Sequence, residues 1–417
     1  MIFYLVEMML LRRTGNLSRK LIINQYQRYI SKSIGIDVIN PIIGLNDDQK
    51  QFYQLARDFA DTELFPNASK WEEESKFPID TFNKFGSIGF GGIFVKDDVG
   101  GSNLTRVDNT IIVEGLATGC VGTTAMLTIH NMCAGMIDKY GNEEQRKKWL
   151  PGLCSMDIKA SYCLTEPGSG SDAASLSTTA VLDPKTNEYI VNGGKAFISG
   201  AGQSDIYLVM CRTGKDSITC LLVPGNTPGL SFGSNEKKMG WKVQPTRQLI
   251  FEDMRIPVTN RIGKEGQGFQ IAMIGLDGGR LSIAACSLGA AQACFEISLK
   301  YIKERKQFGK TIAQNQAIQF KLADMAGKII SSRNMLRSAA NLLDIQHPAA
   351  SSHCALAKKI CTDYGFEVCN DALQLHGGYG YLNDYHVERY VRDVRVHQIL
   401  EGTNEIMRHI VGKAIIS

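Results

Sequence analysis

One glutamate near the end of the chain has neighbours that could direct it into a pocket. In "VHQILEGTNEIMRHI" (residues 396–410), Glu401 lies between an apolar stretch and a Gly-Thr-Asn turn that precedes a helical pattern. Gly402 permits a sharp turn, and Thr403 is a typical N-cap residue. Glu401 is therefore either a solvated acid before a helix or a base that removes a weakly acidic proton. Composition alone does not separate it from Glu405, four residues later.

A turn rich in hydroxyls and glycines follows a predicted strand at "YCLTEPGSGSD". Pro167 excludes a regular helix interior, and Gly168 and Gly170 permit positive φ, so successive backbone N–H groups could converge on an anion such as a pyrophosphate. A surface turn of a β domain is the alternative, because the segment is neither a GxGxxG nor a Walker loop. The residues concerned are Cys163, Leu164, Thr165, Glu166, Pro167, Gly168, Ser169, Gly170 and Ser171.

A second candidate for ligand binding is the segment "KAFISGAG" (195–202), in which Phe197 stands two residues before Ser199. Strand alternation places both on one face, where a ring could pack on a flat ligand and a hydroxyl could bond to its edge. Core packing of Phe197 is the alternative.

Basic and glycine-rich segments in the C-terminal third could bind phosphate groups. "LDGGRLS" would place Arg280 near the start of a helix after two glycines, and "ERKQFGKT" places Arg305 and Lys306 near a helix end. Either could instead be a solvated basic face. In "QLHGGYGY" two glycines let a backbone approach a cofactor or simply cap a helix, and His376 has no second ligand beside it, so no metal site is predicted.

The residue pattern changes twice along the chain, from helical spacing to short β-like runs and back, which predicts three structural regions. After the potential cap Asn46, apolar residues at Phe52, Leu55, Ala56 and Phe59 recur with helical spacing. Short β-branched and aromatic runs broken by Gly, Pro and Asn then predict an antiparallel barrel or sandwich. We therefore expect an α+β, mainly α protein with a helical domain at 44–157, a β domain at 158–264 and a helical bundle at 265–417.

Charge and cysteine content narrow the possible functions. The formal charge is +4, but residues 1–36 hold six Lys and Arg against one acidic residue, so the rest of the chain has 40 basic and 41 acidic residues. This argues against a nucleic-acid footprint on the folded domains. The basic, acid-poor leader is typical of a mitochondrial transit peptide, and its apolar start is too short for a membrane span. The 11 cysteines contain no CxxC pair and are expected to be free thiols.

Six motifs in this order resemble those of the acyl-CoA dehydrogenase family of flavoenzymes: "CLTEPGSGSD", "KAFISGAG", "LDGGR", "ERKQFGKTIAQNQA", "QLHGGYGY" and "HQILEGTNEIMR". The resemblance runs from about residue 44 to the C-terminus. It implies a helical N-terminal domain, a central β domain and a C-terminal four-helix bundle. It further implies a homotetramer with one FAD per subunit, a location in the mitochondrial matrix and electron transfer to electron-transferring flavoprotein.

The resemblance also implies roles for individual residues. Glu401 would be the catalytic base, because Gly279 occupies the position at which some relatives carry the base instead. The turn from Cys163 to Ser171 would line FAD, and the other FAD contacts would be Phe197, Ile198, Ser199, Arg305, Asn315, Gln316, Gln374, Leu375, His376, Gly377, Gly378, Thr403, Asn404 and Glu405. Some of these would reach the FAD of a neighbouring subunit. The acyl-CoA contacts would be Ser171, Asp277, Gly278, Gly279, Arg280 and Lys413. Lys413 stands where close relatives carry Arg, which keeps the charge but loses a bidentate fork.

Within the family the motifs are most similar to those of members that act on isobutyryl-CoA. The implied reaction is α,β-dehydrogenation to methacrylyl-CoA in valine breakdown, with the base removing the α-proton and FAD accepting the β-hydride. In the family the thioester oxygen is held by the backbone N–H of the base and by a hydroxyl of the FAD ribityl chain. Another short or 2-methyl-branched acyl-CoA is an alternative substrate. A non-catalytic helical scaffold is an alternative of another class.

Overall fold

The computed structural model describes residues 37–416. The predicted transit peptide therefore lies outside the described residues. Residues 37–43, which contain a short 3-10 turn at Asp37–Ile39, belong to a separate unit, and the fold considered below is that of residues 44–416.

The first part of the fold is helical, as predicted. Its helices are α3 (Asp47–Phe59), α4 (Phe65–Glu73), α5 (Ile79–Ser87), α6 (Arg106–Ala117), α7 (Val121–Tyr140) and α8 (Glu143–Cys154). The predicted cap at Asn46 is confirmed: its side chain accepts from the Gln49 N–H at 2.8 Å and Gln49 bonds back to the Asn46 N–H, which forms a capping box. A π-helical turn at Ala60–Leu64 joins α3 to α4.

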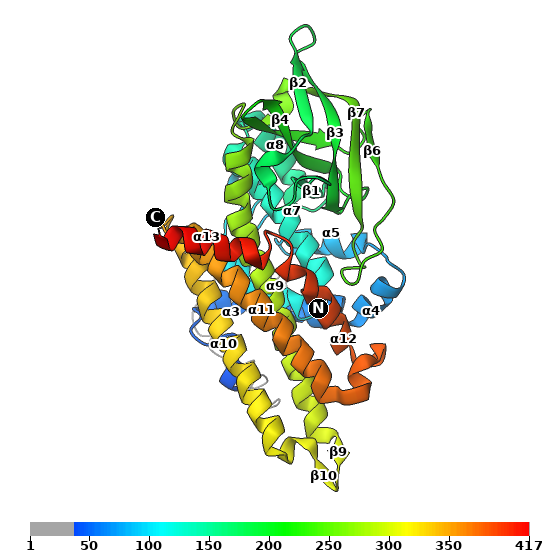
Figure 1. Cartoon of the computed structure of the whole chain (residues 1–417), viewed down its shortest axis with the longest axis vertical. Coiled ribbons are helices and arrows are strands. Elements are labelled where there is room, and N and C mark those ends of the chain that lie inside the picture. The colour runs from blue at the N-terminus through cyan, green and yellow to red at the C-terminus, as the bar shows by residue number, and fades with distance from the viewer. Residues whose placement is uncertain (1–36, 417) are drawn as a thin grey trace, which may run out of the picture. The chain divides into compact units, whose positions relative to one another are not determined.

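The middle part is one eight-stranded sheet in the order β6-β7-β3-β2-β4-β5-β8, with β1 also paired to β4 (Figure 1). Its strands are β1 (Ala160–Cys163), β2 (Thr179–Asp183), β3 (Glu188–Ser199), β4 (Ile206–Gly214), β5 (Ser217–Pro224), β6 (Leu230–Phe232), β7 (Thr246–Pro257) and β8 (Arg261–Ile262). The predicted β module is confirmed, with one difference. The sheet is mixed, because β1 and β2 both run parallel to β4.

Alternation along β4 divides the apolar residues of the sheet between two cores. Leu208 and Met210 pack in a cluster with residues of α7, α8 and α9 (Gly268–Glu304), whereas Tyr207 and Val209 point into a cluster formed by the β region alone. One face of the sheet is thus anchored to α7, α8 and α9. The other face closes over its own side chains, as expected for a barrel or sandwich.

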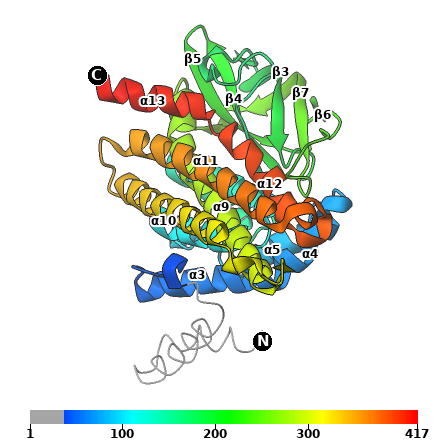
Figure 2. The same ribbon diagram turned by 60° about the horizontal axis from the view of Figure 1, so that its bottom comes forward.

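The last part consists of long helices, α9 (Gly268–Glu304), α10 (Gln316–Asp344) and α11 (Ala350–His376), followed by α12 (Val387–Arg395) and α13 (Asn404–Ile416). A two-stranded hairpin, β9 (Lys306–Gln307) and β10 (Lys310–Thr311), connects α9 to α10. Figure 2 shows α9, α10 and α11 side by side. On length and composition α9 alone among the described helices could cross a membrane, but 78% of its most apolar window is buried inside the protein, so it is the central core helix.

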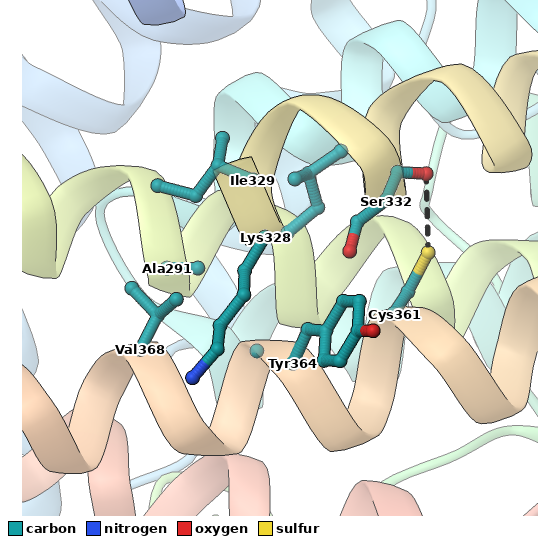
Figure 3. Close-up of a pocket in the computed structure, with 9 residues that line it drawn as sticks. Ala291, Lys328, Ile329, Ser332, Cys361, Tyr364 and Val368 are labelled. Atoms are coloured by element: carbon teal, nitrogen blue, oxygen red, sulfur yellow. Dashed lines mark hydrogen bonds between the residues drawn. The ribbon is translucent and has the colours of Figure 1, made fainter. Parts of the chain in front are cut away.

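A small pocket lies between α9, α10 and α11, lined by Ala291, Ser332, Cys361 and neighbouring side chains (Figure 3). It leaves no space that a water molecule could occupy. No residue predicted for the functional site lines it, and it is a packing gap of the bundle.

Candidate active site

Glu401 lies in the turn between α12 and α13, and its backbone is unusual. Its φ of 55° and the φ of 86° at Gly402 are both in the left-handed region. Glycine adopts this conformation freely, but a residue with a Cβ pays about 1–2 kcal/mol for it. Thr403 then begins α13 as predicted, accepting from the Ile406 N–H at 3.3 Å. The surrounding structure therefore has to hold Glu401 in a conformation that the residue does not prefer.

The side chain of Glu401 lies against the backbone of α9 at Gly279. A Cβ added at residue 279 would stand 2.6 Å from Glu401 Oε2, which is too close for any real contact. Gly279 therefore makes room for the carboxylate. The sequence-based expectation for this segment is wrong in one respect: the glycines of "LDGGR" do not precede a helix but lie inside α9, so Arg280 is at mid-helix. Gly278 has a similar function, since a Cβ there would stand 2.5 Å from Arg106 Nη1.

One oxygen of the Glu401 carboxylate is shielded from solvent. Part of the residue reaches the surface, but Oε2 is fully covered and has no hydrogen-bond partner within residues 37–416. Burial raises the pKa of Glu401 to about 7, although Arg280 and Lys358 act in the opposite direction. A solvated acid before a helix is therefore excluded. Glu405, by contrast, is exposed on α13.

Two cations approach the Glu401 turn from two helices. Arg280 of α9 donates through Nε to the Glu401 carbonyl at 3.4 Å and through Nη1 to Asp277 Oδ1 at 2.7 Å. Lys358 of α11 donates to the Gly402 carbonyl at 2.8 Å. Lys358 was not among the sequence-predicted residues, because it stands in an ordinary helical pattern 43 positions before Glu401 with no motif around it.

The hydroxyl-rich turn forms a tight loop directly after β1 in the chain. Glu166 and Ser169 exchange two backbone hydrogen bonds across Pro167 and Gly168. Gly168 and Gly170 do not use the positive φ that glycine permits. Both glycines instead have no heavy atom within 4 Å of where a Cβ would stand, so they present open backbone. Within the turn Pro167, Gly168, Gly170 and Ser171 are exposed, Thr165 is half-buried, and Cys163, Leu164, Glu166 and Ser169 are buried.

A buried ion pair supports this turn from below. Lys195 Nζ donates to Glu166 Oε1 at 2.7 Å and to the Leu164 carbonyl at 3.1 Å, and its side chain is fully buried. Glu166 also accepts from the N–H groups of Ser177 and Thr178. Burial alone would raise the pKa of Glu166, but these bonds outweigh it and hold the pKa at about 2. The Glu166 side chain is thus used inside the protein, so a cofactor could meet only its backbone.

Phe197 is exposed beside the turn rather than packed in the core. It sits at a bulge in the pairing of β3 with β7, has φ of 58°, and 68% of it is accessible. An aromatic ring held outward by a strained backbone is suited to packing against a flat ligand. Ala196 N–H donates to the Thr165 carbonyl at 2.8 Å, which ties the strand to the turn. Ile198 is buried and Ser199 is half-buried.

A cavity of about 470 Å³ at the far end of the bundle gathers another predicted set. Arg305 caps α9 there, and the guanidinium stands 5.3 Å from the centre of the Tyr379 ring. Gly377 ends α11 with φ of 60°, and no atom lies within 4 Å of a Cβ at Gly377 or Gly378. Predicted residues lining the cavity are Arg305, Gln374, Leu375, His376, Gly377 and Gly378. Asn315 and Gln316, at the start of α10, do not line it.

The remaining predicted residues lie on α9 and on or near α13. Asn404 is buried, and its side chain bonds to Lys358, Thr362 and Asp363, so it braces the turn and offers no free group to a ligand. Thr403 is half-buried, and Glu405 and Lys413 are exposed. Asp277 and Arg280 pair with each other on α9, where Asp277 also accepts from Ser351 at 3.0 Å.

Family models match the three parts of this fold in order. They describe the N-terminal, middle and C-terminal domains of acyl-CoA dehydrogenase and match residues 46–157, 161–254 and 266–416. The chain belongs to the acyl-CoA dehydrogenase family.

Individual relatives can be aligned with this sequence over nearly the whole chain. Mitochondrial isobutyryl-CoA dehydrogenases from Dictyostelium discoideum and Bos taurus are 57% and 54% identical, over 91% of this chain and 91% and 92% of theirs. Among solved structures, butyryl-CoA dehydrogenase from Megasphaera elsdenii has a TM-score of 0.87 at 35% identity, covering 90% of this chain and 100% of that one. An acyl-CoA dehydrogenase complexed with FAD from Bacillus anthracis has a TM-score of 0.85 at 31% identity, covering 92% and 69%.

The contact between Gly279 and Glu401 can be tested by adding one carbon atom. Gly279→Ala should displace the carboxylate, because the new Cβ would overlap Oε2 while the rest of α9 has no reason to move. We expect acyl-CoA turnover to fall about 10- to 100-fold with cofactor content unchanged, since small misplacements of a reacting group have effects of this size. Gly327→Ala is the control, because a Cβ at this exposed position in α10 meets nothing within 4 Å. Equal turnover in the two variants would show that Gly279 does not set the position of Glu401.

The ion pair below the turn should be essential to the stability of the β domain. Lys195→Met leaves Glu166 buried without its cation, and such a change typically costs about 3–5 kcal/mol. Unfolding in denaturant at fixed protein concentration measures this loss, and the double variant Lys195→Met/Glu166→Gln should recover part of it. Arg255→Met is the control, because its pairs with Asp183 and Glu188 are on the surface and should contribute less than about 1 kcal/mol. A loss no larger than that of the control would contradict the assignment.

Proposed function

We propose that the protein is an FAD-dependent dehydrogenase that oxidises isobutyryl-CoA to methacrylyl-CoA. The observation that carries this proposal is the buried, unpaired Glu401 carboxylate, held over Gly279 in a chain of this family. The relatives at 54–57% identity support isobutyryl-CoA as the substrate, and valine breakdown as the setting in which this thioester is formed.

The described residues fit FAD at two places. The turn with open backbone at Gly168 and Gly170, beside the exposed Phe197 ring, can receive a flat ring system and adjoining phosphates. The cavity at the end of the bundle offers Arg305, open glycines and aromatic rings to another part of the cofactor, or to the cofactor of a neighbouring subunit. The solved relative bound to FAD supports this assignment. When bound, FAD supplies the acceptor for the β-hydride.

Glu401 would remove the α-proton of the thioester. That proton is weakly acidic, so the base needs both a raised basicity and a fixed position next to the α-carbon. Burial supplies the first, and the cradle at Gly279 supplies the second. The backbone N–H of Glu401 makes no hydrogen bond within residues 37–416, so it is available for the thioester oxygen, the role that the family resemblance implies.

The acyl-CoA would lie between α9 and the β domain. Asp277 and Arg280 are fixed by their mutual bond and would contact the pantetheine side, together with Ser171 of the exposed turn. Lys413 would meet the phosphates of CoA as a point charge. We also infer a homotetramer and electron transfer to electron-transferring flavoprotein, because the family resemblance implies both. The names of the mitochondrial relatives support a matrix location.

Replacing the carboxylate by an amide tests the base. We expect Glu401→Gln to retain FAD and to bind acyl-CoA, but to lose at least about 10³-fold in turnover, since general base catalysis supplies up to roughly 10⁴-fold. Glu405→Gln, an exposed acid in the same segment, should have little effect. Turnover is measured with an electron acceptor under saturating isobutyryl-CoA. Near-normal turnover in Glu401→Gln would refute the assignment of the base.

The substrate can be tested by anaerobic titration of the purified protein. Isobutyryl-CoA, 2-methylbutyryl-CoA, butyryl-CoA and isovaleryl-CoA are added separately, and the bleaching of the flavin band gives the rate of reduction for each. We expect isobutyryl-CoA to react fastest. One methylene changes binding by only about 1–3 kcal/mol, so neighbouring substrates should react more slowly rather than not at all. If isobutyryl-CoA were among the slowest, the substrate would be another short or 2-methyl-branched acyl-CoA; a protein without a flavin spectrum would favour a scaffold.

A further inference from the structure

The environment of Lys358 is unusual for a lysine. It lies on α11 with a relative exposure of 0%, and its ammonium donates to the Gly402 carbonyl and to Asn404 Oδ1, both at 2.8 Å. Both acceptors are uncharged. Among the described residues no carboxylate lies within ion-pair distance of Lys358, whereas Arg280, the other cation near Glu401, is paired with Asp277. A buried cation without a counter-ion is costly unless a nearby charge compensates it.

The groups that Lys358 holds belong to the turn of the candidate base. The carbonyls of Glu401 and Gly402, the two residues with left-handed backbone, accept from Arg280 and Lys358 respectively. Asn404, the second acceptor, is the first residue of α13. Lys358 thus links α11 to both sides of the turn that aims Glu401.

We propose that Lys358 is a positioning residue for the reaction: it fixes the Glu401–Gly402 turn through the Gly402 carbonyl and Asn404, and it places a buried positive charge beside the turn that carries the Glu401 carboxylate. This inference rests on the proposed function, because it assumes that Glu401 is the base. Lys358 acts through Glu401 and touches no reacting atom.

Charged and titratable groups from several elements face Glu401. Arg280 of α9 and Lys358 of α11 lower its pKa, and burial raises it more. Cys133 of α7 is buried, and Tyr162 of β1 is half-buried with its hydroxyl covered; burial, with a smaller contribution from Glu401, raises the pKa of each. Glu401 in turn supports the charge on Lys358, with weaker help from Asp363 and Glu405, although burial lowers the pKa of Lys358 to about 8. Removing the charge of Lys358 while Arg280 stays should therefore raise the pKa of Glu401 above about 7.

The sign of the pH effect follows from this. The base acts when it is ionised, so kcat/KM rises with pH through the pKa of Glu401. If the pKa rises by about one unit, the value expected when an opposite charge nearby is removed, the acid limb moves about one unit to higher pH. The loss in kcat/KM would be about fivefold at pH 7 from titration alone, and would shrink as the pH increases. Any loss that persists at pH 9 measures the displacement of the turn.

The experiment uses the FAD-bound protein with Lys358→Met and Lys358→Gln, and measures kcat/KM for isobutyryl-CoA between pH 6 and 9. Methionine removes both the charge and the hydrogen bonds, while glutamine removes the charge and keeps an amide donor. We expect the acid limb to shift in both variants, and a smaller pH-independent loss in Lys358→Gln. Lys328→Met is the control: this lysine pairs with Glu367 on the bundle surface, and its profile should match that of the unmodified protein.

A second measurement covers the case in which Lys358→Met is stable but too slow to assay. A carboxyl whose folded pKa is above its unfolded value destabilises the protein above the folded pKa, and this effect disappears as pH falls. The difference in unfolding midpoint between Lys358→Met and Lys358→Met/Glu401→Gln isolates Glu401. That difference should vary with pH from the unfolded pKa of Glu401, which is the same in both pairs, up to its folded pKa. With Lys358→Met the upper end of this range should lie about one unit higher than in the comparison of the unmodified protein with Glu401→Gln.

The outcomes separate this inference from the proposed function. If Glu401→Gln is inactive and both Lys358 variants keep the acid limb of the unmodified protein, Lys358 is only a structural link and the inference fails alone. If Glu401→Gln is active, the proposed base is wrong. Parallel profiles with a uniform loss at every pH would also overturn the charge role, because a merely structural defect has no reason to follow the ionisation of Glu401.

Discussion

The candidate active site depends on one constraint: the Glu401 carboxylate must be held against a helix backbone with its Oε2 atom covered and, within residues 37–416, without a hydrogen-bond partner. Burial raises the pKa of this carboxylate, and its own backbone is in a conformation that glutamate disfavours. A strained residue of this kind keeps its conformation only if several surrounding contacts hold it in place. Gly279 leaves the space that the carboxylate occupies. Arg280 and Lys358 donate to the backbone carbonyls of Glu401 and Gly402.

This constraint explains the architecture around it. α9 has to be continuous, because a break at the glycine pair would remove the wall against which the carboxylate rests. It must also be central, since it contacts α6, α7, α10 and α11 as well as the sheet. The β domain is attached through the cluster that contains Leu208, Met210 and residues of α7 and α9. The exposed turn and Phe197 therefore lie on a rigid support, as a cofactor site requires.

Local patterns in the sequence predicted much of the fold and the main candidate residues, because caps, alternation and helical spacing act over a few residues. The Asn46 capping box, the Thr403 cap and the change to β texture are of this kind. Patterns failed where a distant partner decides the conformation. A glycine pair indicates a break, yet Gly278 and Gly279 lie inside α9, and they are glycines because Arg106 and Glu401 occupy the space that a Cβ would need. No sequence pattern identifies Lys358 for the same reason, since its hydrogen-bond partners are more than 40 residues away in the chain.

Two buried lysines show how the protein treats its two functional turns differently. Lys195 and Lys358 each donate to one backbone carbonyl and one side-chain oxygen of the turn that they support. The oxygen belongs to Glu166 in the first case and to Asn404 in the second. A carboxylate neutralises Lys195, so the turn at residues 163–171, the proposed flavin contact, is braced with little net charge nearby. The amide of Asn404 also accepts from Lys358 but does not neutralise it. Among the described residues no carboxylate lies within ion-pair distance of Lys358, and the acid that does most to keep it charged is Glu401, the proposed base.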